Sequence, residues 1–129
     1  MGTPISIVLV EDNEIFREAL ELLLGLRDDV AVVASVGDGA DAARVCAEVR
    51  PDVVLMDYRL PGLDGVQATG AVRDASPSSA VVCLTASANL REMDALLAAG
   101  AVACLSKDQE LDEIVAAIHR AAATRTAGA

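Results

Sequence analysis

Polar side chains that could perform chemistry stand at the ends of four apolar, strand-like runs of this sequence. An aspartate ends one run, a glutamate and an aspartate follow another, a threonine comes directly after the third, and a lysine lies just beyond the fourth. Function in open α/β sheets collects at the carboxyl ends of parallel strands, so we expect these groups to share one edge of a sheet. The residues are Glu11, Asp12, Asp57, Thr85 and Lys107.

Crowded carboxylates repel one another, and without a counter-charge at least one of the three would keep its proton. A divalent cation removes this conflict, and a ligand set made only of oxygen atoms favours Mg²⁺, or Mn²⁺ in its place, over zinc or copper. Beside such an ion, Asp57 could attack phosphorus and form an acyl phosphate. Lys107 would then pair with the phosphoryl oxygens. Thr85 would donate a hydrogen bond to one of them, and the small Ala86 would leave the approach open.

The stretches between these residues alternate between strand-like and helix-like patterns. Five strand–helix units in a row predict an α/β fold with a parallel sheet and helices on both faces. The flavodoxin-like (βα)5 order 2-1-3-4-5 places the first and third strands side by side, which would bring the three acids together. We predict strands at 5–10, 30–34, 53–57, 80–84 and 101–105, and helices at about 14–26, 40–49, 64–75, 89–99 and from 109 onward.

Caps and apolar spacing support the first and last of these helices. Asn13 and Asp108 are suited to N-cap them. Apolar side chains recur on one face of each helix at α-helical spacing. They are Phe16, Leu20, Leu23 and Leu24 in the first helix, and Leu111, Ile114, Val115 and Ile118 in the last.

Composition limits the class of protein. The 129 residues suit one domain, and a hydrophobic content of 53% allows a sizeable core. No apolar run approaches the ~20 residues of a membrane span, and the first residues lack a signal-peptide pattern, so we expect a cytoplasmic protein with no membrane contact. The net charge of −10 disfavours direct binding of nucleic acid by this segment.

The cysteines and the single histidine form no familiar metal or redox motif. No C-x-x-C pair occurs among the three cysteines. Cys83 and Cys104 lie in apolar strand runs, where a free thiol behaves as a small hydrophobe, so we expect both to fill the core. His119 falls in the last helix, and we expect it on the surface.

Four short motifs are specific as a set. They are Val-Glu-Asp-Asn at 10–13, Met-Asp-Tyr-Arg-Leu-Pro-Gly-Leu-Asp-Gly at 56–65, Leu-Thr-Ala-Ser at 84–87, and Gly-Ala at 100–101 followed by Leu-Ser-Lys-Asp at 105–108. With them, essentially the whole chain resembles the CheY-like receiver domain of bacterial two-component response regulators. The amino-acid sequences of these motifs are most similar to those of the NarL/FixJ (LuxR-type) subfamily.

This resemblance implies a role for each acid. Asp57 would accept a phosphoryl group from a sensor histidine kinase in a Mg²⁺-dependent reaction. Asp12 would bind the ion directly and Glu11 through water, and Asp57 and the backbone carbonyl of Arg59 would be further ligands. The protein would be a signalling module and not an enzyme, acting at most on its own phosphorylation and dephosphorylation.

The resemblance also implies a switch. Thr85, Ala86 and Lys107 would bind the phosphoryl oxygens and bias a surface made by the fourth helix and fifth strand. One position departs from the family, since Cys104 stands where most members carry the aromatic residue that turns inward on activation. The residues two positions after Asp57 and after Thr85 would border the path of the hydrolytic water and tune the phosphoryl lifetime. They are Arg59 and Ser87.

Three other classes of protein could place an aspartate or a phosphate-binding site at a strand end or share the receiver fold. A haloacid-dehalogenase-like phosphatase carries a second aspartate two residues after its nucleophile, where this chain has Arg59. A nucleotide-binding Rossmann domain needs a G-x-G-x-x-G turn after the first strand, which is absent from the sequence. A pseudo-receiver that binds other proteins without phosphorylation stays open as the alternative.

The output is not encoded in this segment. We assign residues 1–123 to the receiver and 124–129 to a C-terminal tail or the start of a linker. Transcription regulation would require DNA contact through a C-terminal effector domain outside the chain. Homodimerisation on phosphorylation is expected by analogy with the family.

Overall fold

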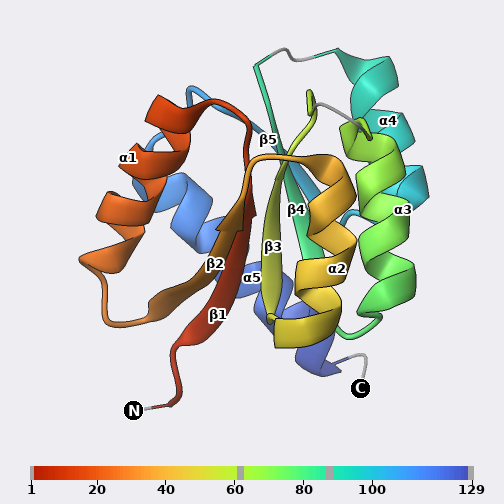
Figure 1. Cartoon of the computed structure of the whole chain (residues 1–129). Helices are drawn as coiled ribbons and strands as arrows, with labels where there is room; N and C mark the ends of the chain where they lie inside the picture. Colours follow the sequence, from red (N-terminus) through yellow and green to blue (C-terminus); the bar gives the residue numbers. More distant parts are fainter. Residues whose placement is uncertain (1, 61–62, 87–88, 128–129) are drawn as a thin grey trace.

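The computed structural model describes residues 2–60, 63–86 and 89–127. Within these ranges, parallel strands form a sheet in the order β2-β1-β3-β4-β5, with helices on both faces (Figure 1). The predicted flavodoxin-like topology is therefore confirmed. The strands are β1 (Ile5–Val10), β2 (Val30–Val36), β3 (Val53–Asp57), β4 (Ala80–Thr85) and β5 (Ala103–Ser106), and the helices are α1 (Glu14–Gly25), α2 (Gly39–Val49), α3 (Gly65–Ala75), α4 (Leu90–Ala99) and α5 (Leu111–Ala127).

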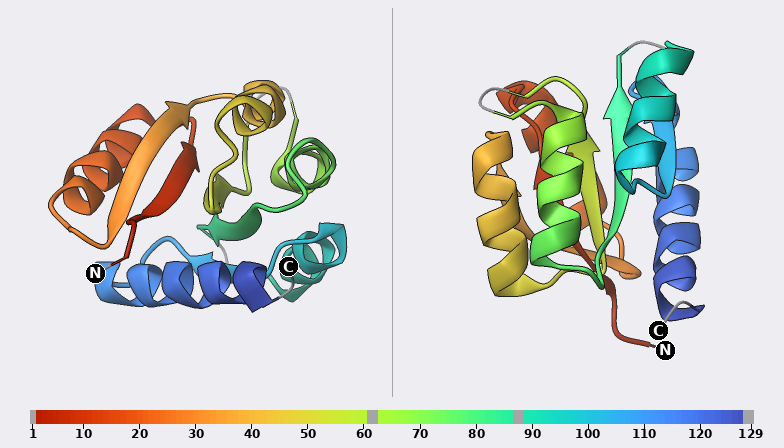
Figure 2. Two further views of the ribbon diagram at one scale, coloured as in Figure 1. Left: turned by 90° about the horizontal axis from the view of Figure 1, so that it is seen from below. Right: turned by 90° about the vertical axis from the view of Figure 1, so that its right-hand side faces the viewer.

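The sheet separates two aliphatic cores. Figure 2 shows α1 and α5 on one face and α2, α3 and α4 on the other. Alternating residues of each central strand enter opposite cores, so Leu55 packs toward α5 while Val54 and Met56 pack toward α2 and α3. Every residue of β3 and β4 is buried, because helices cover both of their faces.

Short polar side chains begin the helices that follow the functional strands. The Asn13 side chain accepts a hydrogen bond from the Phe16 amide at 3.0 Å and caps α1, as predicted. Asp64 and Gln67 form a reciprocal capping box at the start of α3. The Asn89 side chain accepts hydrogen bonds from the Arg91 and Glu92 amides and caps α4. These caps fix where each chain segment leaves the carboxyl edge of the sheet.

The predicted cap of the last helix is wrong. The Asp108 carboxylate bonds the Ser106 hydroxyl instead, inside a turn closed by the Gln109 amide and the Ser106 carbonyl at 3.2 Å. The first helical amides donate to the Glu110 carbonyl, so α5 begins at Leu111. The helix then continues through residues 124–127, which we had assigned to a tail or linker.

Other predicted boundaries shift for visible reasons. The fifth strand begins at 103, not 101, because the Ala101 amide donates to the Leu96 carbonyl and closes the C-terminus of α4 around the left-handed Gly100. The second strand extends to Val36, which pairs with Val10. Leu23, expected on the apolar face of the first helix, is 42% exposed.

None of the described helices combines the length and apolar character required to cross a bilayer.

The loop between β3 and α3 approaches the end of β3 closely. The Gly65 amide donates to the Tyr58 carbonyl at 2.7 Å. A Cβ atom added at Gly65 would lie 2.7 Å from the Tyr58 Cα, inside van der Waals contact with backbone. Glycine is therefore required here by space, next to the residue that follows Asp57.

We expect Gly65→Ala to destabilise the protein by about 1–3 kcal/mol, because the loop or the end of β3 must move to accept the methyl group. Gly70→Ala is the matched control: it lies in the same helix with nothing within 4 Å of the added Cβ. That variant should gain about 0.5–1 kcal/mol from helix propensity. Urea denaturation of both variants measures the difference, and equal stabilities would contradict the steric argument.

Candidate functional site

The carboxyl ends of β1 and β3 bring the three predicted acids together. Glu11 and Asp57 are almost fully buried, at 3% and 4% exposure, while Asp12 is exposed. Oxygen atoms of these three carboxylates lie within 4.8 Å of one another. The adjacency follows from the strand order, because β1 pairs directly with β3.

Hydrogen bonds hold these acids in place. One Glu11 carboxylate oxygen accepts the Asn13 amide at 3.0 Å, and the Glu11 carbonyl accepts a bond from the Arg17 guanidinium at 2.7 Å. The Asp57 Oδ1 accepts the Arg59 amide at 3.3 Å. Arg59 thus lies beside the site, as predicted, although the direction of its carbonyl stays a prediction.

Lys107 reaches the acids from the end of β5. Its Nζ lies 2.7 Å from Glu11 Oε1 and 3.1 Å from Asp57 Oδ1. Burial alone would lower the pKa of Lys107, but the two carboxylates outweigh it and the pKa is raised. The side chain therefore stays an ammonium and bridges the two buried acids.

One ammonium does not balance three carboxylates. Burial raises the pKa of Asp57 to about 7, the negative charge of Glu11 adds to the rise, and Lys107 opposes it. The site thus carries excess negative charge in a poorly solvated place. Carboxylate oxygens without thiol or imidazole are the ligands that Mg²⁺ prefers, so the residues present fit such an ion.

The hydroxyl and the lysine come from neighbouring strand ends. Thr85 is the last residue of β4 and is 4% exposed. Its carbonyl accepts the Lys107 amide at 2.8 Å, which sets the two residues beside each other. Ala86 follows and is exposed. Ser87, the second predicted tuning position, lies outside the described residues, as do Pro61 and Gly62 of the predicted loop.

Sequence reasoning missed one member of the site. The Phe16 ring lies beneath the lysine, with its centroid 4.9 Å from Lys107 Nζ. This distance suits a cation–π contact, which favours the charged form of the lysine. The position of Phe16 in the first turn of α1, four residues after Asp12, was the available signal.

Cys104, the residue expected to depart from the family pattern, is half-buried. Cys104 packs against the core under α2, α3 and α4 but is not enclosed, so its predicted role as core filler is only partly met. Cys83 is fully buried, as predicted.

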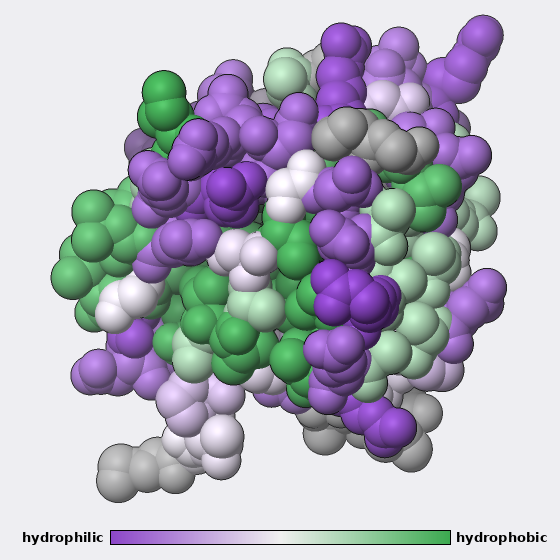
Figure 3. All heavy atoms as spheres, in the orientation of Figure 1, coloured by the Kyte–Doolittle hydropathy of each residue, from purple (hydrophilic) through white to green (hydrophobic). Residues whose placement is uncertain are grey.

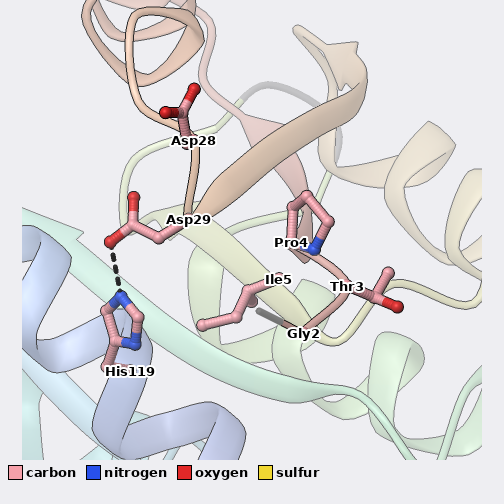
Figure 4. A pocket seen from close by; sticks show the side chains of 7 residues that line it. All are labelled: Gly2, Thr3, Pro4, Ile5, Asp28, Asp29 and His119. Atoms are coloured by element: carbon pink, nitrogen blue, oxygen red, sulfur yellow. Dashed lines mark hydrogen bonds and ion pairs between the residues drawn. The ribbon is translucent and has the colours of Figure 1, made fainter.

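A separate hollow opens at the opposite ends of the strands (Figure 4). There His119 of α5 lies on the surface, as predicted, with its Nε2 2.7 Å from Asp29 Oδ2. Arg27 also pairs with Asp29 at 2.9 Å. The hydrogen bond with Arg27 has the larger effect and that with His119 the smaller, and together they hold the pKa of Asp29 well below its usual range. This network fastens α5 to the turn between α1 and β2.

Comparison with known proteins places the whole arrangement in one group. Residues 7–119 match the family described as the response regulator receiver domain. The transcriptional regulatory protein LnrK of Bacillus subtilis is 37% identical over 114 residues, which cover 88% of this chain and 52% of LnrK. The nitrate/nitrite response regulator NarL of Escherichia coli K12 is 28% identical over 120 residues, covering 93% of this chain and 56% of that protein.

Solved structures agree. The signal receiver domain of the putative response regulator NarL from Mycobacterium tuberculosis superposes with a TM-score of 0.89 at 35% identity, covering 94% of this chain and 98% of that one. A LuxR-family two-component response regulator from Aurantimonas gives a TM-score of 0.88 at 33% identity, with 95% and 87% coverage. The chain spans about half the length of the curated relatives it matches.

The charge imbalance predicts a pH-dependent stability in the absence of divalent cations. The pKa of Asp57 is about 7 when folded and about 3.9 when unfolded. The folded state therefore binds this proton more tightly than the unfolded state does. The resulting gain in the free energy of unfolding is fully present below about pH 4 and is lost as pH rises toward 7. Asp57→Asn removes the charge, and in EDTA it should be more stable than wild type by on the order of 1–3 kcal/mol at pH 8.

Urea denaturation between pH 4 and pH 8 measures this effect. Asp74→Asn makes the same chemical change at an exposed acid of α3 and should follow the wild type at every pH. If the free energies of unfolding of wild type and Asp57→Asn differ by the same amount at every pH, the buried charge is not the cause of the difference.

Proposed function

The chain belongs to the response regulator receiver domain family and is a receiver of two-component signal transduction, and on that premise we propose that Asp57 accepts a phosphoryl group from a sensor histidine kinase. The observation that carries the assignment is the buried Asp57 carboxylate, flanked by two further acids and held by Lys107 at 3.1 Å.

In the proposed reaction, an Asp57 oxygen attacks the phosphorus of the phosphohistidine. The new bond is an acyl phosphate, and the electron pair of the broken P–N bond leaves with the imidazole. Lys107 already lies beside the reacting oxygen, so it can follow the phosphoryl oxygens as a point charge. The Thr85 hydroxyl, at the adjacent strand end, would donate to another of them.

Glu11, Asp12, Asp57 and the carbonyl of Arg59 are the groups we propose to hold Mg²⁺, or Mn²⁺ in its place. When bound, the ion supplies positive charge that offsets the carboxylates and the incoming phosphoryl oxygens. Burial of Glu11, with its bonds to Asn13 and Lys107, keeps this acid in position for that role. Arg59 also borders the approach of a hydrolytic water, so we assign it, with Ser87, to tuning the phosphoryl lifetime.

We propose that the chain acts as a signalling module and not as an enzyme toward other molecules. The arrangement offers one nucleophile that becomes modified and no second aspartate two residues later, where Arg59 stands. Any catalysis would be limited to phosphorylation and dephosphorylation of Asp57. The alternative remains a pseudo-receiver that binds partners without phosphorylation, but the complete set of acid, hydroxyl and lysine favours the active form.

Two relatives are named for regulation, LnrK for transcription and NarL for the response to nitrate and nitrite. We infer that this receiver likewise controls transcription, through a DNA-binding effector domain outside the present chain. The net charge of −10 makes direct DNA contact by the receiver unfavourable. A cytoplasmic location accords with a kinase and DNA as its partners.

A surface for the expected homodimer is available on α1. Apolar side chains gather there in Figure 3, at the left of the molecule. Ile15 and Leu22 of α1 and Leu26, which caps its C-terminus, are 82%, 67% and 76% exposed and recur at helical spacing. Monomeric proteins rarely leave such a stripe uncovered. We name these three residues the α1 stripe and propose that two copies pack through it when Asp57 is phosphorylated.

The first test is phosphorylation by acetyl phosphate with and without Mg²⁺, read by intact mass. We expect one phosphoryl group on the wild type only when Mg²⁺ is present, and none on Asp57→Asn. Lys107→Ala should slow the gain at least tenfold, because the ammonium beside the nucleophile is lost. An unmodified wild type under all Mg²⁺ conditions would favour the pseudo-receiver.

The dimer is tested by sedimentation of the phosphorylated protein. Leu22→Gln should weaken association at least tenfold, since it removes an apolar contact at the centre of the α1 stripe. Leu90→Gln is the control, because Leu90 is equally exposed, at 74%, but lies on α4. Loss of association in the Leu90 variant alone would move the interface to α4 and exclude the α1 stripe.

A further inference from the structure

Two of the three cysteines stand side by side on neighbouring strands. Cys83 of β4 is the register partner of Cys104 of β5. Adjacent strands lie about 4.7–4.9 Å apart, and the Cα atoms of disulfide-bonded cysteines are usually about 4.4–6.8 Å apart. The backbone therefore places both residues within the range that one S–S bond can join.

Both side chains also lie on the same face of the sheet. Cys83 belongs to the buried cluster beneath α2, α3 and α4, and Cys104 packs against that cluster. Burial raises the pKa of Cys83 to about 12, and the charge that Cys104 would carry as a thiolate adds to the rise. The third cysteine, Cys46, is fully buried in α2.

Access distinguishes the two members of the pair. Cys104 is partly open to solvent, whereas Cys83 has no exposed surface and contacts the Thr69 hydroxyl at 3.7 Å. An oxidant in solution would therefore meet Cys104 first. Burial and the nearby Glu92 carboxylate of α4 raise the pKa of Cys104. Its thiolate is thus scarce at neutral pH, and its oxidation should be slow.

We propose that Cys83 and Cys104 are an oxidation site that forms an intramolecular disulfide with a peroxide. The Cys104 thiolate attacks the O–O bond, which gives a sulfenic acid and, with one proton, water. The Cys83 sulfur then displaces the sulfenic oxygen, forming the S–S bond and releasing a second water. Two thiols lose two electrons in total, the peroxide gains them, and both thiol protons end in water.

The bond would join the two strands whose ends carry the switch residues. Cys83 precedes Thr85 by two residues and Cys104 precedes Lys107 by three. The Lys107 amide already donates to the Thr85 carbonyl at 2.8 Å, so the strands are coupled at this point. A disulfide between Cys83 and Cys104 would join the strands just before these residues and would restrict the movement of Thr85 toward a phosphoryl group. Formation of the disulfide does not depend on the proposed phosphoryl transfer. The restriction of Thr85 does, because it rests on the proposed function.

The test exposes the folded protein to hydrogen peroxide at mildly alkaline pH and then alkylates the remaining thiols. Intact mass and peptide mapping should show loss of two hydrogens and a Cys83–Cys104 linkage, in wild type and in Cys46→Ser alike. Cys104→Ser and Cys83→Ala should form no such linkage. Stable oxygen addition at Cys104, linkage through Cys46, a disulfide between chains, or three free thiols would each overturn the proposal.

The consequence is measured separately, on Cys46→Ser, by acetyl phosphate labelling before and after oxidation. We expect the oxidised protein to react several-fold more slowly and to recover when a reductant opens the bond. Equal rates would remove the regulatory effect while leaving the disulfide itself established by mass. Absence of labelling even in the reduced protein would instead contradict the proposed function, and the mass result would still decide the disulfide.

Discussion

The structure depends on an imbalance of charge at one edge of the sheet. Glu11 and Asp57 are buried side by side with Asp12 at the rim, and Lys107 is the ammonium that pairs with the two buried acids. Burial first and the charge of Glu11 second disfavour the ionised form of Asp57, and this cost appears as its raised pKa. Such an arrangement is poor for stability and well suited to binding a cation and a phosphoryl group.

The fold places this imbalance where it can be used. Parallel strands end at a common edge, and the crossing order puts β1 against β3, so acids distant in sequence become neighbours. The two aliphatic cores hold the strands rigidly from both faces. Close loops then finish the site, as where Gly65 approaches Tyr58, and where the Asn13 cap leads α1 away from Glu11.

The family resemblance implies an aromatic residue at position 104, where this chain carries Cys104. Cys104 has no ring to turn, and Phe16 lies instead against Lys107 on the other face of the sheet. We propose that a signal would instead pass through the backbone contact between Thr85 and Lys107. Near the middle of α5, the contact of His119 with Asp29, which Arg27 also binds, ties that helix to the α1–β2 turn.

The sheet order was predicted from the crossover rules of parallel α/β folds. The sequence by itself determined the strand–helix alternation and which polar residues stand at the strand ends. These features follow from local periodicity, capping residues and the position of polar residues at strand ends, all of which depend on near neighbours in the chain. Tertiary structure alone decided which atoms touch. The pairing of Lys107 with Glu11 and Asp57, the ring of Phe16 beneath it, and the register of Cys83 with Cys104 depend on how separate strands align. Competing local bonds also decided the ends of elements: Asp108 bonds Ser106 instead of capping α5, and Ala101 closes α4 instead of starting β5.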